Sequence, residues 1–112
     1  MLAQRYRFHG YNALNFAHKQ GSIVRGQQLS LKYVKNERRS TYRVAVVVSK
    51  KVSKSAVVRN RIRRRVYEAV RAYTVNESYD LIFMIYSVDV ATLPTELLQK
   101  TIQQQLKKAG VV

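Results

Sequence analysis

Arginine is concentrated in one short stretch of this 112-residue chain. Five of the seven residues from Arg59 to Arg65 are arginine, and Lys50, Lys51 and Lys54 precede them. A guanidinium group stays charged and forms paired hydrogen bonds with phosphate oxygens. Side chains of this kind, gathered this closely, indicate binding to a polyanion.

The residues that catalysis on such a ligand would need are not gathered. A metal-dependent nuclease holds its ions with clustered carboxylates, whereas the six acidic residues here are scattered: Glu37, Glu68, Glu77, Asp80, Asp89 and Glu96. The chain has no cysteine, and its two histidines, His9 and His18, are too far apart in sequence to pair on a metal. We therefore expect no catalytic residue and no metal site in the protein, and interpret it as a binder.

The basic stretch also has the pattern of an amphipathic helix over Ser53–Tyr73, capped by Ser53 or Ser55. At about 100° per residue, one side carries Val58, Ile62, Val66, Ala69, Val70 and Tyr73. The other side carries Asn60, Arg61, Arg64, Tyr67, Glu68 and Arg71, with Arg59, Arg63 and Arg65 at the margins. A solvated helix face usually mixes both charge signs. Glu68 is the only acid from Lys50 to Arg71, which favours an anionic partner instead.

The whole chain is strongly basic. It carries 21 Lys and Arg against 6 Asp and Glu, a net charge of +15, and 46% of its residues are hydrophobic. We interpret residues 1–112 as one domain. Its first candidate ligand is nucleic acid, and the second is an anionic membrane surface. No apolar run is long enough to span a bilayer, and no signal peptide is visible. We expect a soluble, cytoplasmic protein.

The remaining elements predict an α+β fold of two layers, with helices on a small sheet. The patterns indicate a helix over Tyr11–Gln20, strands over Ser22–Arg25, Gln28–Lys35, Tyr42–Ser49 and Tyr79–Tyr86, and a last helix from Pro94 to Gly110 with an apolar stripe of Leu97, Leu98, Ile102, Leu106 and Ala109. The Tyr42–Ser49 strand is apolar on both faces, so we expect it to be central in the sheet.

One face of the sheet is predicted to be polar. Gln28, Ser30 and Lys32 alternate with apolar residues in the first long strand, and Arg43 and Ser49 can join them from the next. Left open by the helices, this face would form a shallow basic groove suited to single-stranded nucleic acid. An ordinary solvated sheet face is the alternative.

Two segments resemble a known signature. Val48-Ser49-Lys50-Lys51-Val52, followed by the run from Ala56 to Arg64 with Arg59-Asn60-Arg61 at its centre, is similar to the protein component of bacterial ribonuclease P. The resemblance covers essentially the whole chain. It implies a two-layer α/β sandwich in the order α-β-β-β-α-β-α, with a left-handed βαβ crossover around the basic helix.

The resemblance also implies a function. The family's enzyme is an endonuclease that removes the 5′ leader from precursor tRNA, and its RNA subunit performs the hydrolysis with Mg²⁺ that the RNA mainly holds. The protein would bind ribonuclease P RNA and the leader, with one protein per RNA.

Site residues follow from the same resemblance. Those implied to bind the RNA are Lys50, Lys51, Lys54, Arg59, Asn60, Arg61, Arg63 and Arg64, and Arg65 joins them from the same basic run. Those implied to line the leader groove are Leu14, His18, Ser30, Lys32 and Tyr67, and Arg43 joins them from the predicted polar face of the sheet. Leu14 and His18 stand where the family usually has aromatic residues, and Tyr67 stands where a basic one is common, so leader preference is expected to differ.

Two other functions share some of these features. A structural RNA-binding protein of the ribosomal type would have the same charge and helix, and relative affinity for the two RNAs separates it from the first hypothesis. An independent nucleic-acid enzyme is disfavoured by the scattered acids.

Overall fold

The computed structural model describes residues 22–35, 41–73, 75 and 79–112. The elements in chain order are β1 (Ser22–Val24), β2 (Leu29–Lys35), β3 (Arg43–Val47), α2 (Ala56–Arg71), β4 (Tyr79–Ile85), the 3-10 helix η2 (Val88–Ala91) and α3 (Thr95–Ala109). The helix expected over Tyr11–Gln20, with Leu14 and His18, lies outside these residues. The loop expected over Asp89–Thr92 is largely the η2 turn.

The four described strands form one sheet in the order β1-β2-β4-β3. β1 pairs with β2, and β2 with β4, in antiparallel fashion, whereas β3 and β4 are parallel. Parallel neighbours need a crossover connection, and α2 provides it. The predicted βαβ unit around the basic helix is therefore confirmed.

The expectation that the Tyr42–Ser49 strand is central is wrong for the described sheet, because β3 lies at its edge. β3 is apolar for a different reason, since it has buried apolar residues on both faces, although Val47 at its end is 44% exposed. Val44 and Val46 belong to the main core, and Ala45, on the opposite face, packs with Ile82 of β4 in a second small cluster. A continuous apolar run indicates that a strand has buried residues on both faces. It does not indicate whether the strand is hydrogen-bonded to a neighbouring strand along both of its edges.

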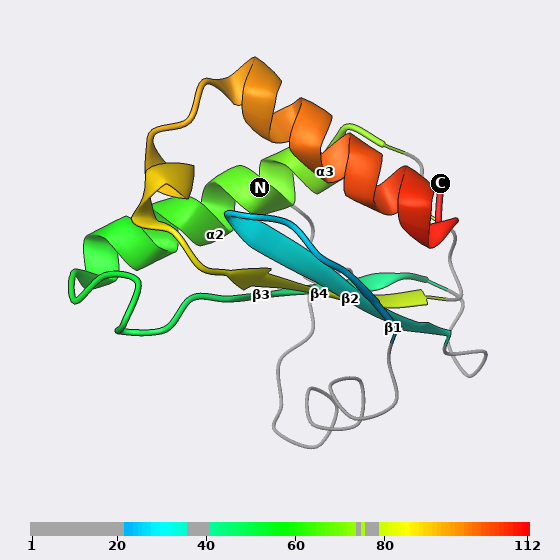
Figure 1. The fold of residues 1–112 in the computed structure, drawn as a ribbon, viewed down its shortest axis with the longest axis horizontal. Coiled ribbons are helices and arrows are strands. Elements are labelled where there is room, and N and C mark those ends of the chain that lie inside the picture. Colours follow the sequence, from blue (N-terminus) through cyan, green and yellow to red (C-terminus); the bar gives the residue numbers. More distant parts are fainter. Residues whose placement is uncertain (1–21, 36–40, 74, 76–78) are drawn as a thin grey trace.

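The two described α-helices lie on one face of the sheet, α2 beside β3 and α3 over β1 and β2 (Figure 1). Their apolar stripes meet the sheet in one core, with Phe83, Leu31, Ile62 and Ile102 fully buried. Full burial of such a side chain contributes about 1.5–3 kcal/mol. The predicted two-layer α+β architecture is confirmed.

The basic helix starts at the second of its two predicted caps. The Ser55 hydroxyl accepts a hydrogen bond from the Val58 N–H at 3.3 Å. Ile62, Val66, Ala69 and Val70 are buried as predicted. Tyr67 is buried with them, so its placement on the polar side was wrong. The buried stripe of α2 is wider than the strict steps of three and four indicate.

The last helix follows Pro94 and ends at Gly110, whose φ of 75° is the left-handed conformation that glycine adopts without strain. Leu98, Ile102 and Leu106 are buried, but Leu97 is 53% exposed and does not belong to the stripe. Gln105 is buried instead, and its side-chain amide donates to the Leu29 carbonyl at 2.8 Å. None of the described helices has the length and apolar character needed to cross a bilayer.

Candidate nucleic-acid interface

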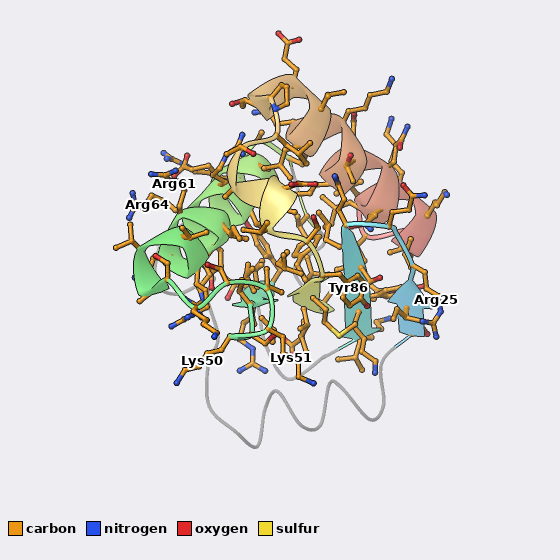
Figure 2. All side chains as sticks on the ribbon, turned by 60° about the vertical axis from the view of Figure 1, so that its left-hand side comes forward. Arg25, Lys50, Lys51, Arg61, Arg64 and Tyr86 are labelled. Atoms are coloured by element: carbon orange, nitrogen blue, oxygen red, sulfur yellow. The ribbon has the colours of Figure 1, made fainter. Side chains whose placement is uncertain are left out.

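The outer face of α2 presents two arginines directly to solvent. Arg61 and Arg64 are exposed, three residues apart on the side of the helix away from the sheet (Figure 2). Neither forms a hydrogen bond or ion pair with any residue in the described part of the chain. Their guanidinium groups therefore keep all of their donors for a ligand.

Asn60 and Arg63 form a pair on the same helix. The Asn60 Oδ1 accepts a hydrogen bond from the Arg63 guanidinium at 2.8 Å, in an exposed position. The amide thereby limits the conformations of a long side chain, while most donors of Arg63 remain available. Asn60 is thus placed to orient a cation as well as to contact a ligand itself.

Arg59 connects the helix to the preceding turn. Its guanidinium donates to the Ser53 carbonyl at 2.9 Å, and the Val52 N–H donates to the Ser49 carbonyl at 3.1 Å. These two bonds order the segment that carries the exposed Lys50, Lys51 and Lys54. The lysines therefore lie on an ordered turn that leads directly into α2, and this turn together with the exposed arginines of α2 is called the cationic surface.

Arg65 behaves differently from its neighbours. Its guanidinium donates to the carbonyls of Val90, at 2.7 Å, and of Leu93, and it is half-buried. These bonds fasten α2 to η2 and to the start of α3. Of the arginines implied to bind RNA, Arg65 is therefore the one most engaged by the protein.

Next to Arg65, a hollow of about 200 Å³ opens between α2 and α3. Its lining residues are Arg64, Arg65, Glu68, Ala69, Thr95, Leu98 and Gln99. Arg64 thus stands at the border between this hollow and the outer face of the helix.

The charge distribution leaves the first turns of α2 without a counterion of their own. No acidic residue lies in the first turn, where the helix dipole already places partial positive charge. Like charges three and four residues apart repel each other by a few tenths of a kcal/mol per pair. An anion bound along this face relieves both effects, so the arrangement favours a polyanionic ligand.

The groove expected on the other face of the sheet is not open at the predicted positions. Ser30 is 1% exposed and its hydroxyl accepts from the Gly26 N–H at 3.2 Å. Arg43 is held by Asp80 through Nε and a terminal nitrogen, at 2.9 and 2.7 Å. Tyr67 is in the core. Among the predicted groove positions that the structure describes, Lys32 is half-buried and keeps partial access without an ion pair to an acidic residue of the described chain.

The physical reason is that this face is not wholly polar. Ala45 and Ile82 are buried on it, with Val34 and Met84 packed against them. The bidentate ion pair from Arg43 is inside this surface, with side-chain exposures of 18% for Arg43 and 3% for Asp80. The positive charge of Arg43 is therefore neutralised by Asp80 within the protein.

Comparison with known proteins decides the family. Residues 2–110 match the family model described as Ribonuclease P. The chain belongs to the ribonuclease P protein family. The ribonuclease P protein component of Roseiflexus castenholzii is 34% identical over 113 residues, covering 99% of this chain and 91% of the relative. That of Clostridium kluyveri is 34% identical over 110 residues, covering 95% and 96%.

Solved structures of ribonuclease P proteins share the fold. The Staphylococcus aureus protein superposes with a TM-score of 0.82 at 25% identity, covering 95% of this chain and 96% of that one. The Thermotoga maritima protein superposes with a TM-score of 0.74 at 18% identity, covering 85% and 89%. The family predicted from the Lys50-Lys51 and Arg59-Asn60-Arg61 segments is confirmed. Membership makes the chain a ribonuclease P protein component, and ribonuclease P is an endoribonuclease complex.

Sequence reasoning in this ribonuclease P protein missed two exposed side chains at one end of the sheet, Arg25 and Tyr86 (Figure 2). Each directly follows the last residue of a strand, Val24 and Ile85 respectively. Their exposure could have been predicted from their position at the ends of strands, where the alternation of buried and exposed side chains stops. Composition alone contains no such signal.

Proposed function

We propose that this protein is the subunit of ribonuclease P that binds the catalytic RNA through the outer face of α2 and the adjacent lysine turn. The observation that carries the proposal is the pair Arg61 and Arg64, exposed and without a partner in the described chain, on a helix whose opposite side is fixed in the core. A rigid row of unpaired guanidinium groups matches the spaced phosphates of a folded RNA.

In this proposal the RNA performs the hydrolysis that removes the 5′ leader and generates the mature tRNA end. Mg²⁺ would be held mainly by the RNA. Within the described residues, no three His, Cys, Asp or Glu side chains come together in a way that could hold a metal ion. The protein contributes positive charge, which replaces counterions around the RNA and stabilises its compact form. We infer one protein per RNA, in the cytoplasm.

Reconstitution tests the proposal. The protein is mixed with a bacterial ribonuclease P RNA and assayed on precursor tRNA over a Mg²⁺ series at constant ionic strength. We expect leader removal at Mg²⁺ concentrations where the RNA alone is inactive, and no cleavage by protein freed of RNA. An unchanged Mg²⁺ requirement, or cleavage by the RNA-free protein, would contradict the proposal.

Competition with ribosomal RNA at matched salt is the control for a structural RNA-binding role. Preference for ribonuclease P RNA supports the proposal, because the general attraction to phosphate does not depend on sequence and is matched for the two RNAs at the same salt concentration. Equal or stronger binding to ribosomal RNA would favour the ribosomal-type alternative.

A further inference from the structure

The hollow between α2 and α3 combines an apolar interior with a charged border. It measures about 200 Å³, and two of its lining residues, Ala69 and Leu98, are each only 2% exposed. Pockets for drug-sized ligands enclose about 300–1,000 Å³, so a space of this size holds about a single ring system. The hollow therefore fits one small planar group and excludes larger ligands.

Arg65 lines the hollow with a planar group of fixed orientation. Its guanidinium donates to the carbonyls of Val90 and Leu93. The N–H groups of a guanidinium lie in its plane, so these bonds fix the plane and leave its faces without hydrogen bonds. Nucleobases stack on arginine planes. A base that enters the hollow can therefore stack on Arg65.

Polar side chains at the hollow provide partners for the edge of a base. The side chains of Thr95 and Gln99 form no hydrogen bond within the described part of the chain, since the Tyr73 hydroxyl donates to the backbone carbonyl of Gln99. Glu68, on α2, is 46% exposed, and its ion pair with Arg71 is long, at 3.7 Å. A carboxylate accepts as many as about four hydrogen bonds and donates none. It therefore favours guanine, which presents two adjacent N–H donors, over uracil.

Arg64 connects the hollow to the outer face of α2. It lines the hollow and, like Arg61, is exposed and without a partner in the described chain. An unpaired guanidinium binds phosphate oxygens in pairs. We propose that the hollow binds a nucleotide, with its base stacked on Arg65 and its phosphate held by Arg64. Glu68 and Gln99 hydrogen-bond the edge of the base and favour guanine.

Two molecules carry this chemistry, an unpaired nucleotide of the ribonuclease P RNA and a free mononucleotide. The first rests on the proposed function and adds recognition of a base at α3 to the phosphate contacts of α2. The second is independent of the proposed function and competes with the RNA for Arg64. The experiment has one arm for each source.

The first arm titrates the whole protein with guanosine monophosphate, uridine monophosphate and ribose 5-phosphate at fixed salt. Ribose 5-phosphate measures the general attraction of a chain with a net charge of +15 for phosphate. We expect guanosine monophosphate to bind about five- to a hundredfold more tightly than ribose 5-phosphate, the range for one stacked base. Uridine monophosphate should bind with an affinity between the two.

Thr95→Trp fills the hollow with a bulky side chain at an exposed position. It should lower the affinity for guanosine monophosphate to that for ribose 5-phosphate. Gln104→Trp is the matched control, because Gln104 is exposed on α3 and does not line the hollow. Equal affinity of the original protein for guanosine monophosphate and ribose 5-phosphate overturns the inference. So does an effect of Thr95→Trp no larger than that of Gln104→Trp.

Two smaller changes test the contacts to the base edge. Gln99→Ala removes the side-chain amide and keeps the carbonyl that accepts from Tyr73. Glu68→Gln keeps the shape of the side chain and adds a donor. We expect both variants to bind guanosine monophosphate several-fold more weakly, and Glu68→Gln to lose the preference over uridine monophosphate. A preference that stays unchanged in Glu68→Gln overturns the assignment of the base edge, and chemical denaturation checks that both variants are folded.

The second arm uses the absence of cysteine from the chain. Gln99→Cys carries a thiol-linked photo-crosslinker in the complex with ribonuclease P RNA, and Gln104→Cys is the control. A crosslink to one nucleotide, absent from the control, assigns the site to the RNA. Guanosine monophosphate binding without such a crosslink assigns it to a free nucleotide. Leader removal at low Mg²⁺ is measured separately, so a failure of the proposed function leaves the result of the first arm intact.

Discussion

Arg64 and Arg65 are neighbours in one helix and have opposite surroundings. The Arg64 side chain is exposed and has no partner in the described part of the protein, whereas Arg65 donates to the carbonyls of Val90 and Leu93 and is half-buried. A rotation of about 100° around the helix separates them. The fold therefore divides the arginines into an exposed set, Arg61 and Arg64, which is the ligand-binding set of our proposal, and a structural set, Arg43 and Arg65.

The largest expected effect is on the structural side, at Arg43. Arg43→Ala leaves the Asp80 carboxylate, only 3% exposed, without its bidentate partner. Loss of one partner of a buried ion pair costs about 3–5 kcal/mol; because Arg43 is itself 18% exposed, we expect about 3 kcal/mol. Chemical denaturation of the free protein measures the free energy of unfolding. Arg61→Ala is the control, and an equal loss in both variants would contradict the division.

Arg65→Ala is expected to destabilise the protein less, by about 2 kcal/mol, because two partly buried hydrogen bonds lose their charged donor. Arg65→Lys should recover part of that loss through one remaining bond. Arg64→Ala should change stability by less than about 0.5 kcal/mol, as is usual for a surface position. The measurement is again chemical denaturation at fixed salt. Similar stability in Arg64→Ala and Arg65→Ala would remove the contrast between the two residues.

The elements were predictable from local pattern, and so was the family. The α2 stripe of Ile62, Val66 and Val70 repeats at helical spacing, and the alternation in β2 placed Leu31 on the core side and Lys32 on the other. The Lys50-Lys51 and Arg59-Asn60-Arg61 segments are short and contiguous, so a sequence contains all of their information.

What the sequence could not predict is which residues contact one another when they are far apart in the chain. Asp80 is 37 residues from Arg43, and nothing local reveals that β3 and β4 bring them together. The hydrogen bonds of Arg65 were not predictable, because the carbonyls of the η2 turn carry no side-chain signature, and its role in RNA binding stays a prediction. Tyr67 was placed on the polar side because an aromatic residue with a polar tip fits either environment. Sequence pattern predicts which groups are charged, and the strand register decides which of them stay available.

On the ligand side, the double variant Arg61→Ala/Arg64→Ala should leave stability nearly unchanged and weaken binding to ribonuclease P RNA. If each guanidinium contacts one phosphate, the slope of log affinity against log salt falls by about 0.7 to 0.9 for each. Filter binding over a salt series measures it. An unchanged salt slope in the double variant would place the RNA on another surface. The structural variant Arg65→Lys, which keeps its positive charge, is the matched control.

The smallest expected effect is at Asn60, which lies on the border between the two sets. Asn60→Ala removes the Oδ1 that holds the Arg63 guanidinium at 2.8 Å, but leaves every charge in place. Phosphate contacts set the salt slope and hydrogen bonds set register, so the slope should stay within error while affinity falls a few-fold. Asn60→Asp keeps the acceptor and adds a negative charge, so it should lower affinity with a shallower dependence on salt than Asn60→Ala. If Asn60→Ala lowers the slope as much as Arg61→Ala does, Arg63 depends on Asn60 to reach its phosphate, and Asn60 belongs to the ligand-binding set.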